Sequence, residues 1–475
     1  MMAVASPYPN YQPLRSRWVP RVPEHWSLLR AKNFLREIDD RSKAGEETLL
    51  SMRMQRGLVP HNDVSVKRIA PENLIGYKKA QPDELVLNRM QAGNAMFFRN
   101  RQPGLVSPDY AVFRLLRDDN PEYLGHLFRS WPMRGLFRSE SKGLGTGTSG
   151  FLRLYSDRFT ALEIPLPPRP EQDQIVAYLR AQDAHIARFI QVKRDLIKLL
   201  TEQKLRIIDH AVTHGLDASV TLKPSGIEWL GEVPEHWEVA FIKHIADVRF
   251  SGVDKHSHDH ETPVRLCNYT DVYKNDRITG DMDLMRATAT EAEIARLTLK
   301  AGDVILTKDS ETPDDIGVPA WVPEDLPGVV CAYHLGLLRP VPNRVLGEFL
   351  FRAIGSARTA QQFHVLATGV TRFALGKHDV KNAVVALPPV EEQQSICRWI
   401  TNECQPLDDA IARTEEEIKL IREYRDRLIA DVVTGQVDVR GWQPDPDDVV
   451  DDAALAALGD DQEDVTEEED GDGED

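Results

Sequence analysis

The chain has 475 residues, 41% of them hydrophobic, and a formal net charge of −17, so it is long enough for about three domains with cores of their own. The first residues contain no apolar segment typical of a secretory signal, and no run of about 18 apolar residues could span a membrane. The cysteines form no CxxC pair and no zinc-binding spacing, which predicts reduced thiols in the cytoplasm: Cys267, Cys331, Cys397 and Cys404.

Most of the negative charge lies near the C-terminus. Residues 445–475 hold 16 acidic residues and no lysine or arginine, which leaves 58 basic and 59 acidic residues in the rest. Residues 20–165 carry 23 basic and 17 acidic residues, whereas residues 230–385 carry 17 and 22. We therefore expect the first segment to suit a polyanion as a whole, and the second to do so only through a local patch.

A short motif marks two similar halves of the chain. After residues 1–20, which we expect to form a loose arm, the sequence VPEHW occurs at residues 22–26 and again at residues 233–237. Trp18 and Trp229 precede the two copies at the same distance. An internal repeat of this length fixes the architecture before any other motif does.

A large segment of mixed α/β pattern follows each VPEHW motif. Apolar runs after turns predict matched strands, longer stretches have helical spacing, and a glycine-containing loop then leads to a phenylalanine. The expected strands are residues 84–88, 110–115, 303–307 and 332–337. The stretches with helical spacing are residues 121–138 and 346–363, and the loops are residues 143–150 and 367–372.

Each half ends in a long predicted helix. Leu-Pro-Pro at residues 166–168 and 387–389 precedes each copy, and 15 of 48 residues are identical between residues 166–213 and 387–434. The prolines exclude helix on their N-terminal side, and Glu171-Gln172, repeated as Glu392-Gln393, places an acid near the positive end of the helix dipole.

Apolar residues recur in both copies with alternating spacings of four and three, which predicts a coiled-coil pair. We expect Pro406 to break the second copy, with the longer piece starting near Leu407. A second apolar row, Ile190, Ile197 and Ile208 with Ile411, Ile418 and Ile429, predicts a further partner. The residues predicted to pair the helices are Ile186, Phe189, Leu196, Leu200, Ile207, Leu407, Ile421 and Leu428.

Three catalytic or cofactor-binding patterns occur, each in an unsuitable context. Residues 145–150 fit GxGxxG, but a strand-like run follows where a dinucleotide site needs a helix. Asp109 with Glu140 and Lys142 resembles a nuclease PD…ExK arrangement with loose spacing. His256, His258 and His260 alternate as in a metal site, but within a polar, turn-like stretch. We therefore expect no catalytic residue and no metal ligand.

Over residues 15–440 or so, the chain resembles the specificity (S) subunits of type I DNA restriction-modification systems. The residues that carry this resemblance are Trp229-Leu-Gly-Glu-Val-Pro-Glu-His-Trp237, the two LPP…EQ helices, and the order of two variable segments and two similar helices. The resemblance implies a mixed α+β fold, with two similar α/β target recognition domains separated by an antiparallel coiled-coil pair of long helices and related by a pseudo-two-fold axis.

The course of the chain favours the same arrangement. The first helix leaves one segment and enters the next, and the second helix must return to pair with it, so the pair should be antiparallel. The expected division is an N-terminal arm (1–20), target recognition domain 1 (21–166), a central helix (167–218), target recognition domain 2 (219–387), a C-terminal helix (388–440) and an acidic disordered tail (441–475).

The resemblance also implies partners. Each recognition domain would read one half of a bipartite double-stranded DNA site, and the helices would set the spacing and dock two methyltransferase (M) subunits. Restriction/translocase (R) subunits would join for cleavage. This chain would be a non-catalytic, cytoplasmic subunit of an adenine-N6 methyltransferase complex that defends the cell against foreign DNA. It would bind no cofactor itself, because S-adenosylmethionine, ATP and Mg²⁺ belong to the partner subunits.

Basic and polar residues of the two variable segments are the candidate DNA contacts, because lysine and arginine hold phosphates and arginine reads guanine. They are Arg53, Gln55, Arg56, Lys78, Lys79, Arg89, Arg101 and Lys142 in the first segment, and Lys255, Arg265, Asn268, Tyr269, Lys274, Arg277, Lys308 and Arg372 in the second. Two alternatives stay open: a stand-alone restriction nuclease or methyltransferase, and a coiled-coil scaffold that binds no DNA.

Overall fold

The computed structural model describes residues 6–445 except residue 55, residues 145–150, residue 314 and residue 371, together with residue 458. The chain forms two compact units. Unit 1 contains the residues up to Asp195 and those from Thr414 onward, and unit 2 contains Leu196–Arg413. In the part of the chain that is described, no helix combines the length and the apolar character needed to cross a bilayer.

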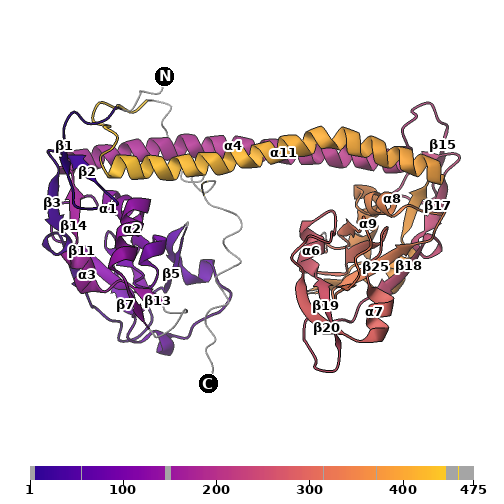
Figure 1. Cartoon of the computed structure of the whole chain (residues 1–475), viewed down its shortest axis with the longest axis horizontal. Coiled ribbons are helices and arrows are strands. Elements are labelled where there is room, and N and C mark those ends of the chain that lie inside the picture. Colours follow the sequence, from indigo (N-terminus) through magenta and orange to yellow (C-terminus); the bar gives the residue numbers. More distant parts are fainter. Residues whose placement is uncertain are drawn as a thin grey trace. The chain divides into compact units, whose positions relative to one another are not determined.

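Two long helices contribute to both units (Figure 1). Helix α4 spans Arg169–His214 and helix α11 spans Val390–Val433, which confirms both predicted helices. The expected break at Pro406 is wrong, because α11 runs through this proline without interruption. A proline removes one backbone hydrogen bond from a helix, and the rest of this 44-residue helix supplies the contacts that offset that loss.

Unit 1 is built around an antiparallel sheet with the strand order β4-β11-β8-β9. Helices α1 and α2 cover it, and buried phenylalanines fill the space between, with Phe97 and Phe128 stacked at 4.7 Å. Its elements besides the long helices are β1 (Tyr11–Pro13), β2 (Arg21–Pro23), β3 (Ser27–Arg30), β4 (Leu35–Ile38), β5 (Leu50–Arg53), β6 (Gly57–Pro60), β7 (Lys78–Ala80), β8 (Leu85–Leu87), β9 (Phe97–Arg99), β10 (Gly104–Val106), β11 (Ala111–Leu115), α1 (Pro121–Arg129), α2 (Trp131–Glu140), β12 (Lys142–Leu144), β13 (Phe151–Arg153), α3 (Ser156–Ala161) and β14 (Glu163–Leu166).

Unit 2 repeats this plan with the sheet β18-β25-β21-β23, and adds a second sheet in which β19 pairs with β20 and β24. Its elements are β15 (Leu222–Pro224), β16 (Glu232–Pro234), β17 (Glu238–Phe241), α5 (Ile242–Ile245), β18 (Ala246–Phe250), β19 (Thr262–Cys267), α6 (Tyr269–Lys274), β20 (Met285–Ala289), α7 (Glu291–Leu297), β21 (Val304–Thr307), β22 (Asp309–Ser310), β23 (Pro319–Trp321), β24 (Val329–Cys331), β25 (Leu335–Pro340), α8 (Gly347–Ile354), α9 (Ala357–Leu366), β26 (Thr368–Gly369), β27 (Phe373–Ala374), α10 (Lys377–Asn382) and β28 (Val384–Leu387).

The two units share a common framework of strands and helices. Strand β1 pairs with β2 as β15 pairs with β16, and β3 pairs with β14 as β17 pairs with β28. Helices α1 and α2 occupy the place of α8 and α9. The predicted repetition of a whole unit is therefore confirmed, and the fold is mixed α+β as expected.

The N-terminal segment is not a loose arm over its described part. Strand β1 pairs with β2, the ring of Tyr8 is buried, and the backbone N–H of Asp438 donates to the carbonyl of Ser6 at 2.8 Å. Tyr8 packs in the same core as Val439, which follows α11, so this segment is part of unit 1.

The long helices pair in an antiparallel sense within each unit. In unit 1, Asp183 of α4 binds Arg425 of α11 and Lys193 binds Glu417, so residue numbers rise along one helix as they fall along the other. In unit 2, Lys204 binds Asp408 at 2.8 Å. The antiparallel pairing is as predicted.

The row of side chains between the helices differs in part from the predicted one. Ile186 and Leu428 are buried and Leu200, Ile207, Leu407 and Ile421 are half-buried, as pairing residues should be. Phe189 and Leu196, however, are 41% and 39% exposed, so their burial does not support the prediction that they pair the helices. Ile190, one position later, is fully buried and takes their place. Two adjacent apolar rows have the same periodicity, and both contribute buried side chains, Ile186 from the predicted row and Ile190 from the adjacent row.

Candidate nucleic-acid interface

In unit 1, a short hairpin presents two of the predicted arginines. Strands β5 and β6 pair from Leu50 to Pro60, and Gly57 turns the chain back with a φ of 73°. Arg129 holds the tip, because its guanidinium donates to the carbonyl of Met54 at 2.8 Å and lies over the ring of Phe98. Arg53 is half-buried, donating to the carbonyl of Val64 at 3.4 Å, and Arg56 is exposed. Gln55, predicted with them, lies outside the described residues.

Three other predicted cations of unit 1 are bound within the domain. Lys78 is buried, donates to the carbonyl of Tyr110 at 2.8 Å and lies 3.7 Å from Glu37. Burial is the main cause that lowers the pKa of Lys78. Arg89 binds Glu37, and Lys79 binds Glu47 at 3.0 Å. These side chains neutralise carboxylates around the sheet, which favours a structural role for them over DNA contact.

The remaining predicted residues of unit 1 lie on its surface. Arg101 and Lys142 are exposed, and Lys142 begins strand β12, which pairs with β13. The glycine-rich loop after β12, residues 145–150, lies outside the described residues. Arg101 and Lys142 therefore join Arg56 as exposed cations among those predicted for this unit, and Arg53 is half-buried.

In unit 2, the structure brings Tyr269, Lys308 and Arg372 into one neighbourhood. Strand β22, which follows Lys308, pairs with β27, which follows Arg372. Burial raises the pKa of Tyr269, and Arg372 is close enough to oppose that shift electrostatically. The ammonium of Lys308 lies 4.6 Å from the ring centre of Tyr333. We give the name unit 2 cluster to six residues: Tyr269, Tyr273, Lys308, Tyr333, Val370 and Arg372.

Three members of the unit 2 cluster are exposed apolar or aromatic side chains that sequence reasoning missed. Tyr333 is 48% exposed, Tyr273 stacks on Tyr269 and is 43% exposed, and Val370 is 92% exposed between β26 and β27. Such side chains are usually buried in a folded domain, so their exposure favours a role in binding. Gly369, next to Val370, was the feature of the sequence that indicated a loop at this place.

Lys308 and Arg89 occupy equivalent places in the two units. The backbone N–H of Leu375 donates to the carbonyl of Lys308 at 2.8 Å, and that of Leu154 to the carbonyl of Arg89 at 2.9 Å. Arg89 is neutralised by Glu37, whereas Lys308 lies between the rings of Phe250 and Tyr333, with Asp309 3.9 Å away. The cation at this position thus forms an internal ion pair in unit 1, whereas in unit 2 it lies next to an exposed tyrosine.

The other predicted residues of unit 2 have mixed surroundings. Asn268 caps helix α6 together with Asp271, and Arg265 donates to the carbonyl of Gly280 at 3.2 Å. Arg277 lies over the ring of Trp321. Lys255 and Lys274 are exposed, and they remain candidates for phosphate contacts.

Two of the three catalytic or cofactor-binding patterns, the PD…ExK pattern and the alternating histidines, lie in the described part of the chain. Neither forms a common site there. Asp109 binds Arg153 at 3.5 Å and Glu140 lies 3.8 Å from Arg158, each in a separate ion pair. His256, His258 and His260 are exposed in a loop. Among the described residues, no group of three or more His, Cys, Asp or Glu side chains is arranged to hold a metal ion.

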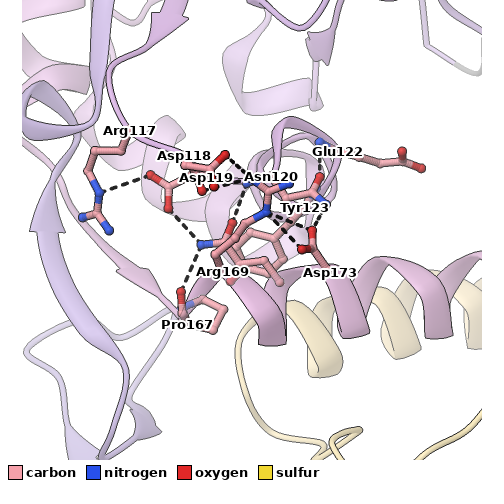
Figure 2. Close-up of polar contacts among 10 residues, drawn as sticks. Arg117, Asp118, Asp119, Asn120, Glu122, Tyr123, Pro167, Arg169 and Asp173 are labelled. Atoms are coloured by element: carbon pink, nitrogen blue, oxygen red, sulfur yellow. Dashed lines mark hydrogen bonds and ion pairs between the residues drawn. The ribbon is translucent and has the colours of Figure 1, made fainter.

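A cavity of about 390 Å³ opens in unit 1 beside the start of α4. Its charged side chains bind one another: Arg99 and Arg180 both bind Glu122, and Arg169 binds Asp173 at 2.9 Å. Figure 2 shows Arg169 and Asp173 of α4 close to Asn120, next to the start of α1. Opposite charges that already satisfy one another give this cavity no obvious anionic or cationic ligand.

Comparison with known proteins finds relatives of one kind, and each matches most of the chain. No protein-family model matches it. The MjaVIII specificity subunit of a type I restriction enzyme, from Methanocaldococcus jannaschii, is 22% identical over 437 residues, covering 88% of this chain and 95% of that protein. The EcoKI specificity subunit of a type I restriction enzyme, from Escherichia coli K12, is 21% identical over 418 residues, covering 82% of each.

One solved structure has the same fold over most of its length. It comes from work on the complex assembly and conformational transition of the type I R-M system. Its TM-score is 0.57 at 14% sequence identity, with 87% of this chain and 99% of that chain covered. At this level of identity the match supports the arrangement of elements.

Proposed function

We propose that this chain, which belongs to the specificity subunits of type I restriction-modification systems, is the DNA-reading component of such a complex. In this proposal residues 21–166 and 219–387 are the two target recognition domains, and each reads one half of a bipartite site. The chain itself carries out no bond-making step. Methylation and cleavage, with S-adenosylmethionine, ATP and Mg²⁺, belong to the methyltransferase and restriction/translocase subunits that it binds in the cytoplasm.

The observation that carries this proposal is the repetition of a whole unit. Each unit contains the VPEHW motif, an antiparallel sheet of the same strand order, two covering helices and part of each of the two equivalent long helices. A protein with two similar domains joined by paired helices suits a DNA target with two defined parts separated by a spacer. A coiled-coil scaffold would not need two matched globular domains.

The surfaces that support DNA contact differ between the units. In unit 1 they are the β5–β6 hairpin with Arg53 and Arg56, and the exposed Arg101 and Lys142. In unit 2 the positive charge is local, and exposed tyrosines accompany it in the unit 2 cluster. Tyrosine can donate to a base edge or a phosphate, and an apolar tip such as Val370 can contact a thymine methyl or a base step.

A repeated leucine supports the docking of methyltransferase subunits on the long helices. Ile197-Lys198-Leu199 recurs as Ile418-Lys419-Leu420. Burial explains why the isoleucine recurs, since Ile418 is buried. Leu199 and Leu420, in contrast, are 62% and 53% exposed. An apolar side chain that recurs at the same place in both repeats without a role in helix pairing fits a partner surface used twice.

The test is to select bound sequences from a random double-stranded DNA library with the full chain. We expect two short half-sites with a spacer of constant length. Lys308→Ala and Tyr333→Ala should weaken one half-site by about fivefold or more, and Arg56→Ala the other. Arg206→Ala, at an exposed arginine of α4, is the matched control and should change neither half-site.

Two results would contradict the proposal. One is the recovery of no bipartite site by the full chain, with or without a methyltransferase partner. The other is turnover by the pure chain alone, seen as labelled or cut DNA after incubation with S-adenosylmethionine, ATP and Mg²⁺. The second result would favour the stand-alone enzyme.

A further inference from the structure

The Glu-Gln pair near the start of each long helix connects that helix to its domain. In unit 1, Glu171 accepts hydrogen bonds from both aromatic members of the VPEHW motif, His25 at 2.7 Å and Trp26 at 3.0 Å. In unit 2, Glu392 makes the same contacts with His236 at 2.8 Å and Trp237 at 3.1 Å. The glutamate therefore joins the helix to the start of its domain.

The glutamine joins each long helix to a second place in the domain. In unit 1 the side-chain oxygen of Gln172 accepts from the backbone N–H of Asn120 at 2.7 Å, and its nitrogen donates to Asp119 at 2.9 Å and to the carbonyl of Pro167 at 3.0 Å. Asn120 caps helix α1. Figure 2 shows Asp119, Asn120 and Pro167 drawn together at this junction.

Unit 2 repeats the glutamine contacts. Gln393 accepts from the backbone N–H of Leu346 at 2.8 Å and donates to the carbonyls of Arg344 at 3.1 Å and Pro388 at 2.8 Å. Leu346 directly precedes helix α8, the counterpart of α1. Both glutamines are fully buried, so water does not compete for these bonds.

These contacts are suited to fixing an angle. Apolar contacts stabilise a junction without a preferred direction, whereas hydrogen bonds from two separate segments to adjacent helix residues restrict how a domain can rotate on its helix. The glutamate and the glutamine are identical in the two repeats although only 15 of 48 helix positions are. We call each set of contacts a node, node 1 in unit 1 and node 2 in unit 2.

Node 1 has additional hydrogen bonds. The hydroxyl of Tyr8 donates to Glu171 at 2.6 Å, and the hydroxyl of Tyr123 on α1 donates to the carbonyl of Val433 on α11 at 3.0 Å. Phe349, at the place of Tyr123 in α8, has no hydroxyl. Glu171 has a side-chain exposure of 7%, against 29% for Glu392. Among the described residues, node 2 thus has fewer polar contacts than node 1.

We propose that Glu171-Gln172 and Glu392-Gln393 are positioning residues that set the angle of each recognition domain on its long helix, and with it the accepted spacer between the half-sites. The proposal rests on the DNA-reading function proposed above. A spacer changed by one base pair turns one half-site by about a tenth of a helical turn, so a domain held at one angle rejects it. Because node 1 is reinforced, node 2 controls how strictly the spacer is read.

The experiment measures binding of the full chain to DNA with both wild-type half-sites and spacers of increasing length. Its readout is the ratio of affinity for the preferred spacer to affinity for a spacer one base pair longer. Gln393→Met keeps the side-chain volume and removes the hydrogen bonds, and we expect it to lower this ratio by about three- to tenfold while the half-site sequences stay the same. Gln172→Met should lower it less, because Tyr8 and Tyr123 still hold unit 1.

Two further variants separate positioning from stability. Combining Gln172→Met with Tyr8→Phe and Tyr123→Phe should lower the ratio as much as Gln393→Met does. Phe363→Leu, which alters the buried core of unit 2 away from node 2, should reduce the melting temperature and the affinity for every spacer alike. An unchanged ratio in Gln393→Met, or an equal fall in Phe363→Leu, overturns the inference. Failure of the wild-type chain to select any bipartite site would instead overturn the proposed function, and this inference with it.

Discussion

His126 lies on α1 in a polar environment formed by both long helices of unit 1. Burial lowers its pKa to about 4, although the negative charges of Asp183 on α4 and Glu122 on α1 favour its protonated form. The positive charges of Arg425 on α11 and Arg129 on α1 act in the same direction as burial. A histidine held neutral next to an ion pair makes the junction of the domain with the helices sensitive to acid.

Acidification should therefore destabilise unit 1 between pH 6.5 and about 4. The folded pKa is below that of the unfolded chain, so the unfolded chain binds more protons in this window and stability is lost as the pH falls. We expect a loss of about 1–2 kcal/mol at pH 5 relative to pH 7. Thermal unfolding of the full chain at both pH values measures it. His126→Gln, which cannot be protonated, should flatten the dependence, and an equally steep fall in that variant would contradict the assignment.

Single charged residues were the least predictable part of the candidate interface. Lys78 and Arg56 look alike in the sequence, as cations in polar stretches. Lys78 is buried because β7 lies near two separate segments, one with Asp39 and one with Tyr110, whereas Arg56 lies at a hairpin tip. That difference arises from contacts between strands distant in sequence, which local patterns do not contain. The aromatic members of the unit 2 cluster were missed for the same reason.

At the scale of elements, the two long helices carry a cation at one repeated position. Lys204 of α4 and Arg425 of α11 are equivalent in the alignment of the repeats. Arg425 binds both carboxylate oxygens of Asp183, at 2.7 and 2.9 Å, and both side chains are largely buried. Lys204 binds Asp408, which is 44% exposed, at 2.8 Å, and lies 3.8 Å from the exposed Asp276. The same repeat position thus holds a buried pair in unit 1 and a more exposed one in unit 2.

Removing the two cations should have unequal effects on stability. Arg425→Met leaves the buried carboxylate of Asp183 without its partner, and we expect the free energy of unfolding to fall by about 3 kcal/mol or more. Lys204→Met leaves a carboxylate that water can reach, with an expected loss below about 1 kcal/mol. Urea denaturation of the full chain followed by circular dichroism compares them.

A double variant tests the physical reason. Replacing both partners, Arg425→Met with Asp183→Leu, should recover most of the stability, because no unpaired charge then remains buried. Equal losses in Arg425→Met and Lys204→Met, or no recovery in the double variant, would show that burial does not distinguish the two pairs.

The helices also show what periodicity can and cannot specify. The 4-3 spacing correctly predicted two long paired helices, because such spacing puts one apolar row on one face. It did not decide between the rows of Phe189 and Ile190, since both are apolar, and only the buried Ile190 faces the interior. The break expected at Pro406 followed a local rule that the rest of a long helix outweighs.

For the whole molecule, the internal repeat predicted most of the architecture. The VPEHW motifs and the LPP…EQ helices mark the start and end of each unit, and their polar residues turned out to contact one another in both nodes. The sequence did not show that the first residues complete unit 1, because β1 and Tyr8 meet the segment around Asp438 from the other end of the chain. Such closure depends on the path of the chain in space.

The continuous α11 changes the expected length of the connection between the domains. A helix starting at Leu407 and ending at Thr434 would span about 42 Å, or on the order of 12 base pairs. The helix observed has 44 residues. At the helical rise it is about 66 Å long, which corresponds to about 20 base pairs of DNA. If the helices act as the ruler between half-sites, their length should control the spacer.

The place to lengthen both helices is where the two units meet in sequence, after Asp195 in α4 and after Arg413 in α11. Lys193 binds Glu417, so these points lie nearly opposite one another in the antiparallel pair. Seven residues inserted at both points preserve the 4-3 seam and add about 10 Å to each helix. We predict the same half-site sequences with a spacer longer by about one to three base pairs, and weaker binding where the rotational phase is wrong.

Selection from a DNA library with randomised spacer length measures the outcome. A four-residue insertion at the same points is the matched control, because it interrupts the seam and should abolish any single preferred spacer. The helix content of each variant is checked by circular dichroism. An unchanged preferred spacer in the seven-residue variant, with its helix content intact, would mean that the distance is set by contacts of the domains with DNA or with partner subunits, and not by the helices.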